Sequence, residues 1–155
     1  MKLISSSHSL HQLGVHIVFC PKYRHQVLTG AVEVELKRII AETCIHYGWL
    51  VQAIEVMPDH VHLFVQIDPF TTANEVAKTI KSITAIQIFT LFPRLKAKKF
   101  WGSGLWSRGT YYGSVGHVNE ETIRNYIESQ KKGGRFIRHH KGGGFLTLIH
   151  KRKSA

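Results

Sequence analysis

Residues 49–67 read WLVQAIEVMPDHVHLFVQI, and they contain two extended runs separated by the pair Pro58-Asp59. Proline and aspartate are frequent in tight turns, because proline fixes φ and aspartate bonds to nearby backbone amides. The β-branched and aromatic residues on either side of the pair favour extended backbone. This stretch therefore predicts a β-hairpin with strands over residues 49–57 and 60–67.

The second predicted strand alternates between an apolar set of residues and a more polar set. Side chains in a strand point to opposite faces with a period of two residues, so each set lies on its own face of the sheet. We expect the apolar set to pack against helices and the other set to bring two imidazoles together. The apolar set is Val61, Leu63, Val65 and Ile67, and the opposite set is His60, His62, Phe64 and Gln66.

The rest of the chain supplies the other elements of the domain. Strands are predicted at residues 15–20 and 105–115, helices at 31–47, from Thr71 or Thr72 to about 91 and at 119–132, and a basic loop at 94–104. The first six elements have the β-α-β-β-α-β order of an α+β, ferredoxin-like (RRM-like) fold. This fold is an antiparallel sheet with helices on one face. Its other face is available for a ligand.

Size and composition indicate one compact domain. The chain has 155 residues, of which 43% are hydrophobic, and a chain of this size removes roughly 70% of its unfolded surface from water without a disulfide or structural metal. Cys20 and Cys44 are therefore expected to be reduced core residues. No apolar run approaches the ~18 residues of a membrane span, so we expect a cytoplasmic protein with no membrane partner.

The charge of the chain points to a polyanionic partner. There are 21 Lys and Arg against 10 Asp and Glu, a formal net charge of +11. Eight of these bases and no acid fall between Lys131 and Ala155, among several Gly residues. We divide the chain into a domain over residues 1–132 and a basic Gly-rich tail over 133–155. The tail is interpreted as an arm attracted to phosphates, or alternatively as a solubilising segment.

Two pairs of side chains suggest chemistry. His60 and His62 share one strand face and would form half of a metal site, or alternatively a pair of surface histidines. Tyr126 and Gln130 are four residues apart and share one face of the last predicted helix. A tyrosine beside an amide oxygen can lie at a metal as nucleophile and third ligand. Tyr111 and Tyr112 are weaker candidates for the nucleophile, because they are strand neighbours with no ligand four residues on.

Three blocks of sequence resemble a known family. Residues 57–63 carry the His-hydrophobic-His core of the HUH endonucleases. Residues 126–130 are similar to the single-tyrosine helix motif of one branch, the IS200/IS605-type TnpA transposases and their REP-associated relatives. Residues 19–24, followed by 27–30, resemble the exit of the first strand in the same family. The blocks have the family's order and spacing, and the resemblance covers roughly residues 14–132.

The resemblance implies an enzyme that cleaves and rejoins single-stranded DNA at hairpin-marked ends of a mobile element. A divalent ion, Mg²⁺ or Mn²⁺, would be held by His60, His62 and Gln130, and Tyr126 would attack a phosphate to give a 5′-phosphotyrosine and a free 3′-OH. The covalent link conserves the energy of the phosphodiester, so no nucleotide cofactor is needed. Family members are homodimers, and we expect a homodimer here.

Basic and aromatic side chains are the candidates for binding that DNA. Phe100, Trp101 and Trp106 could stack on unpaired bases, or Trp106 could lie in the core. The basic residues expected to follow phosphates are Lys22, Arg24, Lys78, Lys81, Arg94, Lys96, Lys98 and Lys99.

Two other interpretations remain open from the sequence. One is a domesticated HUH nuclease that acts on palindromic chromosomal repeats. The other is a non-enzymatic, ferredoxin-like RNA-binding module, whose open sheet face would stack bases. That module would need several aromatic residues on the open face, and Phe64 is the only aromatic residue beside the two histidines on the second strand of the hairpin.

Overall fold

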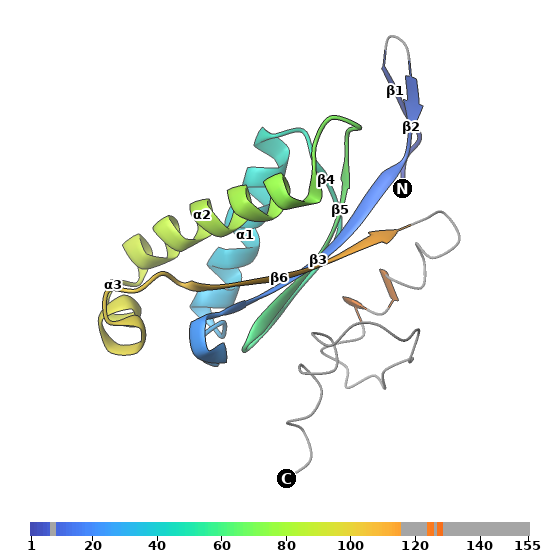
Figure 1. Cartoon of the computed structure of the whole chain (residues 1–155). Helices are drawn as coiled ribbons and strands as arrows, with labels where there is room; N and C mark the ends of the chain where they lie inside the picture. Colours follow the sequence, from blue (N-terminus) through green and yellow to red (C-terminus); the bar gives the residue numbers. More distant parts are fainter. Residues whose placement is uncertain (7–8, 116–123, 126, 129–155) are drawn as a thin grey trace.

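The computed structural model describes residues 1–6, 9–115, 124–125 and 127–128. Within these residues lies a four-stranded antiparallel sheet in the order β4-β5-β3-β6 (Figure 1). The first and third of its strands in chain order are central, which confirms the predicted ferredoxin-like fold. The strands are β3 (Leu13–Pro21), β4 (Leu50–Met57), β5 (His60–Ile67) and β6 (Trp106–Val115).

Two long helices, α1 (Ala31–His46) and α2 (Ala73–Leu91), cover one face of this sheet (Figure 1). Helix α2 begins with a capping box. The Thr72 hydroxyl accepts a hydrogen bond from the Glu75 amide at 3.2 Å, and the Glu75 carboxylate accepts one from the Thr72 amide at 2.7 Å. These two bonds satisfy amides that the start of a helix leaves without partners. The predicted helix is confirmed, with Thr72 as its cap.

The main core lies between the helices and the sheet. Strand β5 contributes Val61, Leu63 and Val65, none of which is exposed to solvent, and Ile67 lies beside them. The predicted alternation is therefore confirmed, because the opposite set of β5 residues lies outside this cluster. The helices contribute Leu36, Ile39, Ile40, Cys44, Val76 and Ile80.

The segment predicted as a basic loop is instead helical over much of its length. It forms α3 (Pro93–Leu95) and a π-helical turn, η2 (Lys96–Phe100). Proline is well placed at the first position of α3 because its missing N–H has no helical partner there. Phe100 is 2% exposed and Leu95 packs against the same core. The apolar residues at both ends of the turn therefore attach this segment to the domain.

Two of the three aromatic residues considered for base stacking lie in the core. Phe100 is buried, and Trp106 is buried with its indole N–H donating to the Thr84 hydroxyl at 2.9 Å. The stacking role is therefore wrong for Phe100 and Trp106, and the alternative core role of Trp106 is confirmed. Trp101 is 86% exposed.

The N-terminal residues form an element that the sequence did not predict. Strands β1 (Ile4–Ser6) and β2 (Ser9–His11) pair as a small antiparallel ribbon. Both strands are short and carry Ser and His instead of an apolar alternation, so their pattern gives no strand signal. Gln66 of β5 accepts a hydrogen bond from the Lys2 amide at 3.0 Å, which attaches the start of the chain to the sheet.

The remaining predictions concern cysteines, membranes and the tail. Cys20 and Cys44 are free and buried, as expected. None of the helices in the described part of the chain is long and apolar enough to span a bilayer. The proposed boundary at residue 132 and the basic tail over 133–155 lie outside the described residues.

Candidate active site

The face of the sheet opposite α1 and α2 carries a group of four polar rings, three of them buried. His60 and His62 come from β5, His16 comes from β3, and Tyr111 comes from β6. The three histidines are 6%, 0% and 4% exposed for His60, His62 and His16, so they are not surface residues on a solvated sheet. We call these four residues, together with Asp59, the histidine cluster.

The His60 ring is oriented by Asp59. Its Nδ1 lies 2.6 Å from Asp59 Oδ1, and Asp59 Oδ2 accepts a hydrogen bond from Arg24 at 2.9 Å. Burial alone would raise the pKa of Asp59, but the bond to His60 and the charges of His60 and Arg24 lower it overall. Asp59 is thus a carboxylate that accepts from His60 Nδ1–H. The other ring nitrogen, Nε2, is buried without a hydrogen-bond partner among the described residues.

The turn that carries Arg24 has an unusual backbone. The short helix η1 (Lys22–Arg24) contains two consecutive residues with positive φ, Tyr23 at 58° and Arg24 at 50°. The backbone of a residue other than glycine is strained in the left-handed region, at a cost of about 1–3 kcal/mol for each residue. The ion pair between Arg24 and Asp59 helps to hold this turn against the start of β5.

The His62 ring contacts His16 of the neighbouring strand, β3. His62 Nδ1 lies 3.1 Å from His16 Nε2. The two rings are nearly parallel, with centroids 5.4 Å apart and an interplanar angle of 15°. Tyr111 makes a T-shaped contact with His16, with ring centroids 5.9 Å apart. The contact with His16 leaves Nε2 as the remaining nitrogen of the His62 ring.

Burial keeps two of these rings uncharged near neutral pH. Desolvation lowers the pKa of His16 from 6.5 to about 4. Desolvation, followed by the positive charges that His16 and His60 would carry, lowers the pKa of His62 well below 6.5, against a small opposing effect of Asp59. A neutral imidazole keeps a lone pair, which is the form that binds a metal.

The donor set of this face fits a metal ion. The His60 and His62 rings are adjacent, with centroids 4.9 Å apart. His60 has a buried acceptor atom with no protein partner in the described chain and a carboxylate behind the ring, an arrangement typical of metal-binding histidines. Among the residues described, no three His, Cys, Asp or Glu side chains are arranged so that they could hold one metal ion together. A third protein ligand would therefore come from another residue type or from the rest of the chain.

The two other predicted site residues, Tyr126 and Gln130, lie outside the described residues. Their immediate neighbours are placed: Arg124–Asn125 and Ile127–Glu128 are helical. Ile127 is fully buried in a cluster with Ala53, Phe64 and Val115.

This second cluster places Ile127 on the histidine side of the sheet. Phe64 follows His62 by two residues on β5, so the two side chains share one face. Arg124 donates to Gln52 Oε1 at 3.1 Å, which adds a contact with β4. Figure 1 shows the described pieces of residues 124–128, in orange, across the sheet from α1 and α2.

The two alternative tyrosines lie on different faces of β6. Tyr111 belongs to the histidine cluster, whereas Tyr112 lies on the helix side and donates to Asn74 Oδ1 at 3.2 Å. Sequence analysis missed His16. Only the pairing of the strands reveals its position. Val18 of β3 lies opposite both His62 and Tyr111, and His16 is on the same face of β3, two residues before Val18.

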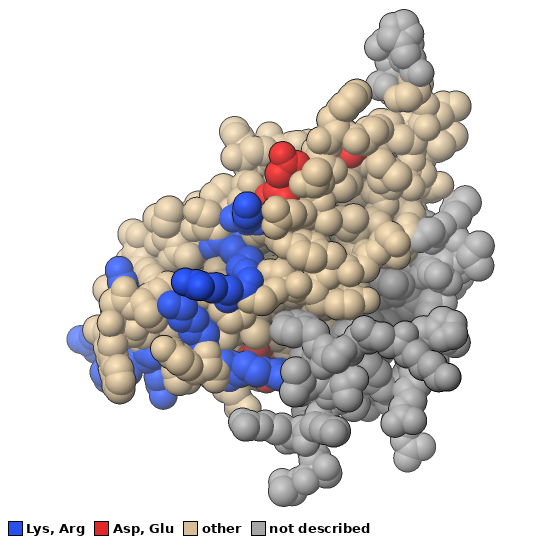
Figure 2. Space-filling model, in the orientation of Figure 1, with Lys and Arg blue, Asp and Glu red and all other residues tan. Residues whose placement is uncertain are grey.

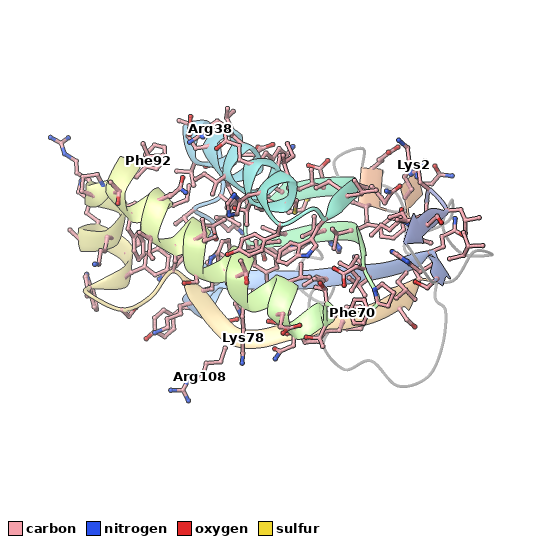
Figure 3. The ribbon with its side chains drawn as sticks, turned by 90° about the horizontal axis from the view of Figure 1, so that it is seen from above. Lys2, Arg38, Phe70, Lys78, Phe92 and Arg108 are labelled. Atoms are coloured by element: carbon pink, nitrogen blue, oxygen red, sulfur yellow. The ribbon has the colours of Figure 1, made fainter. Side chains whose placement is uncertain are left out.

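Two of the basic residues predicted to bind DNA, Lys78 and Lys81, line a groove between α2 and β6. A pocket of about 240 Å³ there is lined by Lys78, Lys81 and Arg108, together with Thr110 and Tyr112. Lys81 donates to the Thr110 hydroxyl at 2.9 Å, and burial lowers its pKa. Figure 3 shows Lys78 and Arg108 on one edge of the molecule and Arg38 on the opposite edge.

The other predicted DNA-binding residues continue this basic surface. Arg94, Lys96, Lys98 and Lys99 are all exposed on α3 and η2. Figure 2 shows Lys and Arg side chains gathered over the region where α2, α3 and β6 lie. Lys22 is half-buried, and Arg24 is committed to its ion pair with Asp59. Arg108 was not predicted, because a single basic residue within a strand carries no distinctive pattern.

The chain is similar to known transposases over most of its length. The family described as "Transposase IS200 like" matches residues 9–130. The ISDra2 transposase TnpA of Deinococcus radiodurans is 39% identical over 121 residues, which cover 78% of this chain and 86% of that protein. The transposase for insertion sequence element IS200 of Salmonella typhimurium is 29% identical over 126 residues, 81% of this chain and 82% of that protein.

Two solved structures have a similar fold. A crystal structure at 1.90 Å, described as a transposase from Deinococcus radiodurans R1, has a TM-score of 0.69 at 33% identity and covers 83% of this chain and 98% of its own. A REP-associated tyrosine transposase bound to a REP hairpin has a TM-score of 0.56 at 18% identity and covers 86% of this chain and 75% of its own. The second similarity concerns the fold alone.

Proposed function

The chain belongs to the family of IS200-like transposases, and on this premise we propose that it cleaves and rejoins single-stranded DNA at the hairpin-marked ends of a mobile element. The named relatives are transposases, so the protein is an enzyme. The observation that carries the proposal is the histidine cluster. It holds three buried imidazoles, two of them from β5, on the face of the sheet where the helical residues next to Tyr126 also dock.

His60, His62 and Gln130 are the residues proposed to hold a divalent ion, Mg²⁺ or Mn²⁺. The ion would supply Lewis-acid chemistry, withdrawing charge from a phosphate oxygen. The protein's own contribution is orientation. Asp59 accepts from His60 Nδ1–H, which leaves His60 Nε2 as the atom available for coordination. The depressed pKa of His62 favours its neutral, coordinating form.

Tyr126 is the proposed nucleophile. Its phenol oxygen attacks the phosphorus, the bond from phosphorus to the 3′ oxygen breaks, and the DNA is left with a 5′-phosphotyrosine and a 3′-OH. The phenol loses its proton during the attack, because a phenol with a pKa of about 10 is otherwise protonated at neutral pH, and the departing 3′ oxygen gains one. A 3′-OH from another strand reverses the step and reseals the DNA.

The basic surface supports a DNA substrate. The groove lined by Lys78, Lys81 and Arg108 offers three positive charges beside the edge strand β6, and the exposed Trp101 offers a ring for an unpaired base. β6 separates this groove from the histidine cluster. A DNA strand bound in the groove would therefore reach the histidine cluster by crossing over β6, the edge strand of the sheet. The REP hairpin bound by a relative of the same fold makes a hairpin the first substrate to test.

A homodimer is also proposed, on the family resemblance. The mass of the protein in solution, measured by sedimentation, tests the homodimer. A mixture of two inactive proteins, Tyr126→Phe and His62→Leu, tests whether two subunits share one site. If the helix of one subunit completes the site of the other, mixed subunits recover a fraction of the wild-type activity. If each site is built from a single chain, the mixture stays inactive, because every subunit lacks either its nucleophile or a ligand.

The test of the proposed function is a search for a covalent adduct. The protein is incubated with labelled single-stranded ends from its flanking DNA, with Mn²⁺ or with EDTA, and separated under denaturing conditions. We expect an adduct with Mn²⁺ and none with EDTA. Tyr126→Phe should abolish the adduct while leaving hairpin binding within about twofold, because the substitution removes only the nucleophilic oxygen.

Tyr111→Phe is the matched control, because Tyr111 lies in the histidine cluster and is the rival nucleophile with the best position. It should still form the adduct. Loss of the adduct in Tyr111→Phe with retention in Tyr126→Phe would overturn the assignment of the nucleophile. An adduct that forms equally in EDTA would overturn the metal dependence.

A further inference from the structure

We propose that His16 is a positioning residue that fixes the tautomer of His62, so that His62 presents a lone pair on Nε2. The inference rests on the proposed metal site and adds a residue from a different strand to it. His16 Nε2 and His62 Nδ1 are 3.1 Å apart, within hydrogen-bond distance. Both rings are buried, so water does not compete freely for this contact.

A single proton decides what His62 can bind. A neutral imidazole carries hydrogen on one nitrogen and a lone pair on the other. If His62 Nδ1 donates to His16 Nε2, the lone pair of His62 is on Nε2 and can coordinate an ion. If His16 donates instead, the His62 hydrogen is on Nε2, and that nitrogen cannot coordinate. His16 therefore supports coordination only as the acceptor.

The arrangement at His60 favours the first possibility. Asp59 is a carboxylate and can only accept, so His60 carries its hydrogen on Nδ1 and its lone pair on Nε2. With His16 as an acceptor, both histidines of β5 present the same nitrogen. Metal-binding histidines generally donate their other N–H to such a partner, which fixes the ring and raises its basicity. Asp59 and His16 would thus serve the two rings in the same way.

The surroundings of His16 hold it in place for this role. Its ring is nearly parallel to that of His62, at 15°, and makes a T-shaped contact with Tyr111. In the sheet His16 lies opposite Gly113, and a Cβ at that position would come within 3.1 Å of the Tyr111 hydroxyl. The missing side chain at Gly113 gives the Tyr111 ring room beside His16. Burying an imidazole costs more free energy than burying an apolar side chain. A role in orienting His62 explains why a histidine occupies this buried position.

The test compares His16→Phe, which keeps a ring but has no acceptor, with His16→Gln, whose amide oxygen can accept from His62 Nδ1–H. The first readout is the dissociation constant for Mn²⁺ alone, measured by the loss of the free-ion EPR signal in the absence of DNA. We expect His16→Phe to weaken binding about 10- to 100-fold, as for other partners behind metal ligands. His16→Gln should stay within about threefold of the wild type. Equal affinities of wild type and His16→Phe would overturn the proposal.

The second readout needs no metal and no variant. Long-range ¹H–¹⁵N NMR of the metal-free wild-type protein reports which nitrogen of His62 carries hydrogen. We expect hydrogen on Nδ1. Hydrogen on Nε2 would overturn the role of His16 even if His16→Phe failed to fold. Absence of Mn²⁺ binding by the wild type would instead count against the proposed function, so the two failures are distinguishable.

Discussion

Leu63 and His62 are neighbours on β5, both fully buried, yet they point to opposite faces of the sheet. Leu63 enters the core under α1 and α2, where it belongs to a cluster of apolar side chains. His62 enters the histidine cluster, where a ring from β3 and a ring from β5 contact it. The same strand thus contributes to two interiors of different chemistry.

The difference leads us to expect that the two faces of the sheet respond differently to substitution. Apolar burial is non-directional and contributes about 25 cal/mol per Å² of surface removed from water, so the helix side tolerates exchange of one apolar residue for another of similar volume. Buried nitrogens need partners in fixed directions. We therefore expect substitutions on the helix side to change the free energy of unfolding, and substitutions in the histidine cluster to change ligand binding.

The largest effects are expected from substitutions of His62 and Leu63, and the two should differ in kind. His62→Leu removes a proposed metal ligand and should weaken Mn²⁺ binding by on the order of 100-fold or more. Its cost in stability should be smaller, about 1–2 kcal/mol, because an apolar side chain fills the space but His16 Nε2 loses its partner. Leu63→Ala should lower the free energy of unfolding by about 3 kcal/mol and leave the Mn²⁺ affinity of the folded protein unchanged. Denaturant titration and Mn²⁺ EPR measure the two quantities. If both variants lost Mn²⁺ affinity and stability to the same extent, the two faces of β5 would not differ in role.

Asp59 allows a finer test within the histidine cluster. Asp59→Ala removes the acceptor behind His60 and should weaken Mn²⁺ binding about 10- to 100-fold. Asp59→Asn keeps an oxygen that can accept from His60 Nδ1–H, and should weaken it much less. If Asp59→Asn were as defective as Asp59→Ala, the negative charge and its pair with Arg24 would matter more than the hydrogen bond.

Acid should destabilise the fold through the histidine cluster. The unfolded chain protonates its histidines near pH 6.5, whereas the folded protein keeps His16 neutral until the pH approaches about 4. The unfolded state therefore binds more protons in this window, so stability is present above pH 6.5 and is lost as the pH falls toward 4. For His16 alone, the loss between pH 7 and pH 5 is about 2 kcal/mol.

Thermal unfolding at pH 7, 6 and 5 checks this expectation. His16→Gln should lose less stability on acidification than the wild type, since it lacks one titrating ring and also relieves the repulsion that lowers the pKa of His62. His46→Gln is the control, because His46 is exposed on α1. A steeper acid loss in His16→Gln than in the wild type would contradict the assignment of the pH dependence to this cluster.

The smallest expected effect concerns the basic groove. Lys78→Ala and Arg108→Ala should each reduce the salt dependence of single-stranded DNA binding, lowering the slope of log K against log salt by about 0.7 to 1 for each phosphate that the variant no longer neutralises. Arg38→Ala serves as the control, because Arg38 lies on the opposite edge and is paired with Glu35 and Glu42. An equal change of slope in all three variants would place the DNA elsewhere.

The sequence predicted much of the fold because alternation and helical periodicity are local patterns. The alternation over residues 60–67 predicted which side chains face the helices and which face the other side. Thr72 and Pro93 predicted the limits of α2. The predicted loop at 94–104 was wrong because a short helical turn has no full period from which to detect it. The β1-β2 ribbon was missed because its residues are mostly polar.

The site was only partly predictable for a different reason. His60 and His62 share one strand, so their proximity follows from sequence spacing alone. His16 is 46 residues from His62, and only the register between β3 and β5 brings the two rings together. The positions of Tyr126 and Gln130 fall outside the described residues and stay predictions.

The most direct test of the proposed metal site is pulsed EPR of Mn²⁺ bound to the protein, which detects coupling to directly bound nitrogen. We expect couplings from two imidazole nitrogens in the wild type, one in His60→Leu and one in His62→Leu, and two in His46→Gln. A Mn²⁺ signal without nitrogen coupling, or with couplings unchanged in His60→Leu and His62→Leu, would show that the ion is bound away from these two rings.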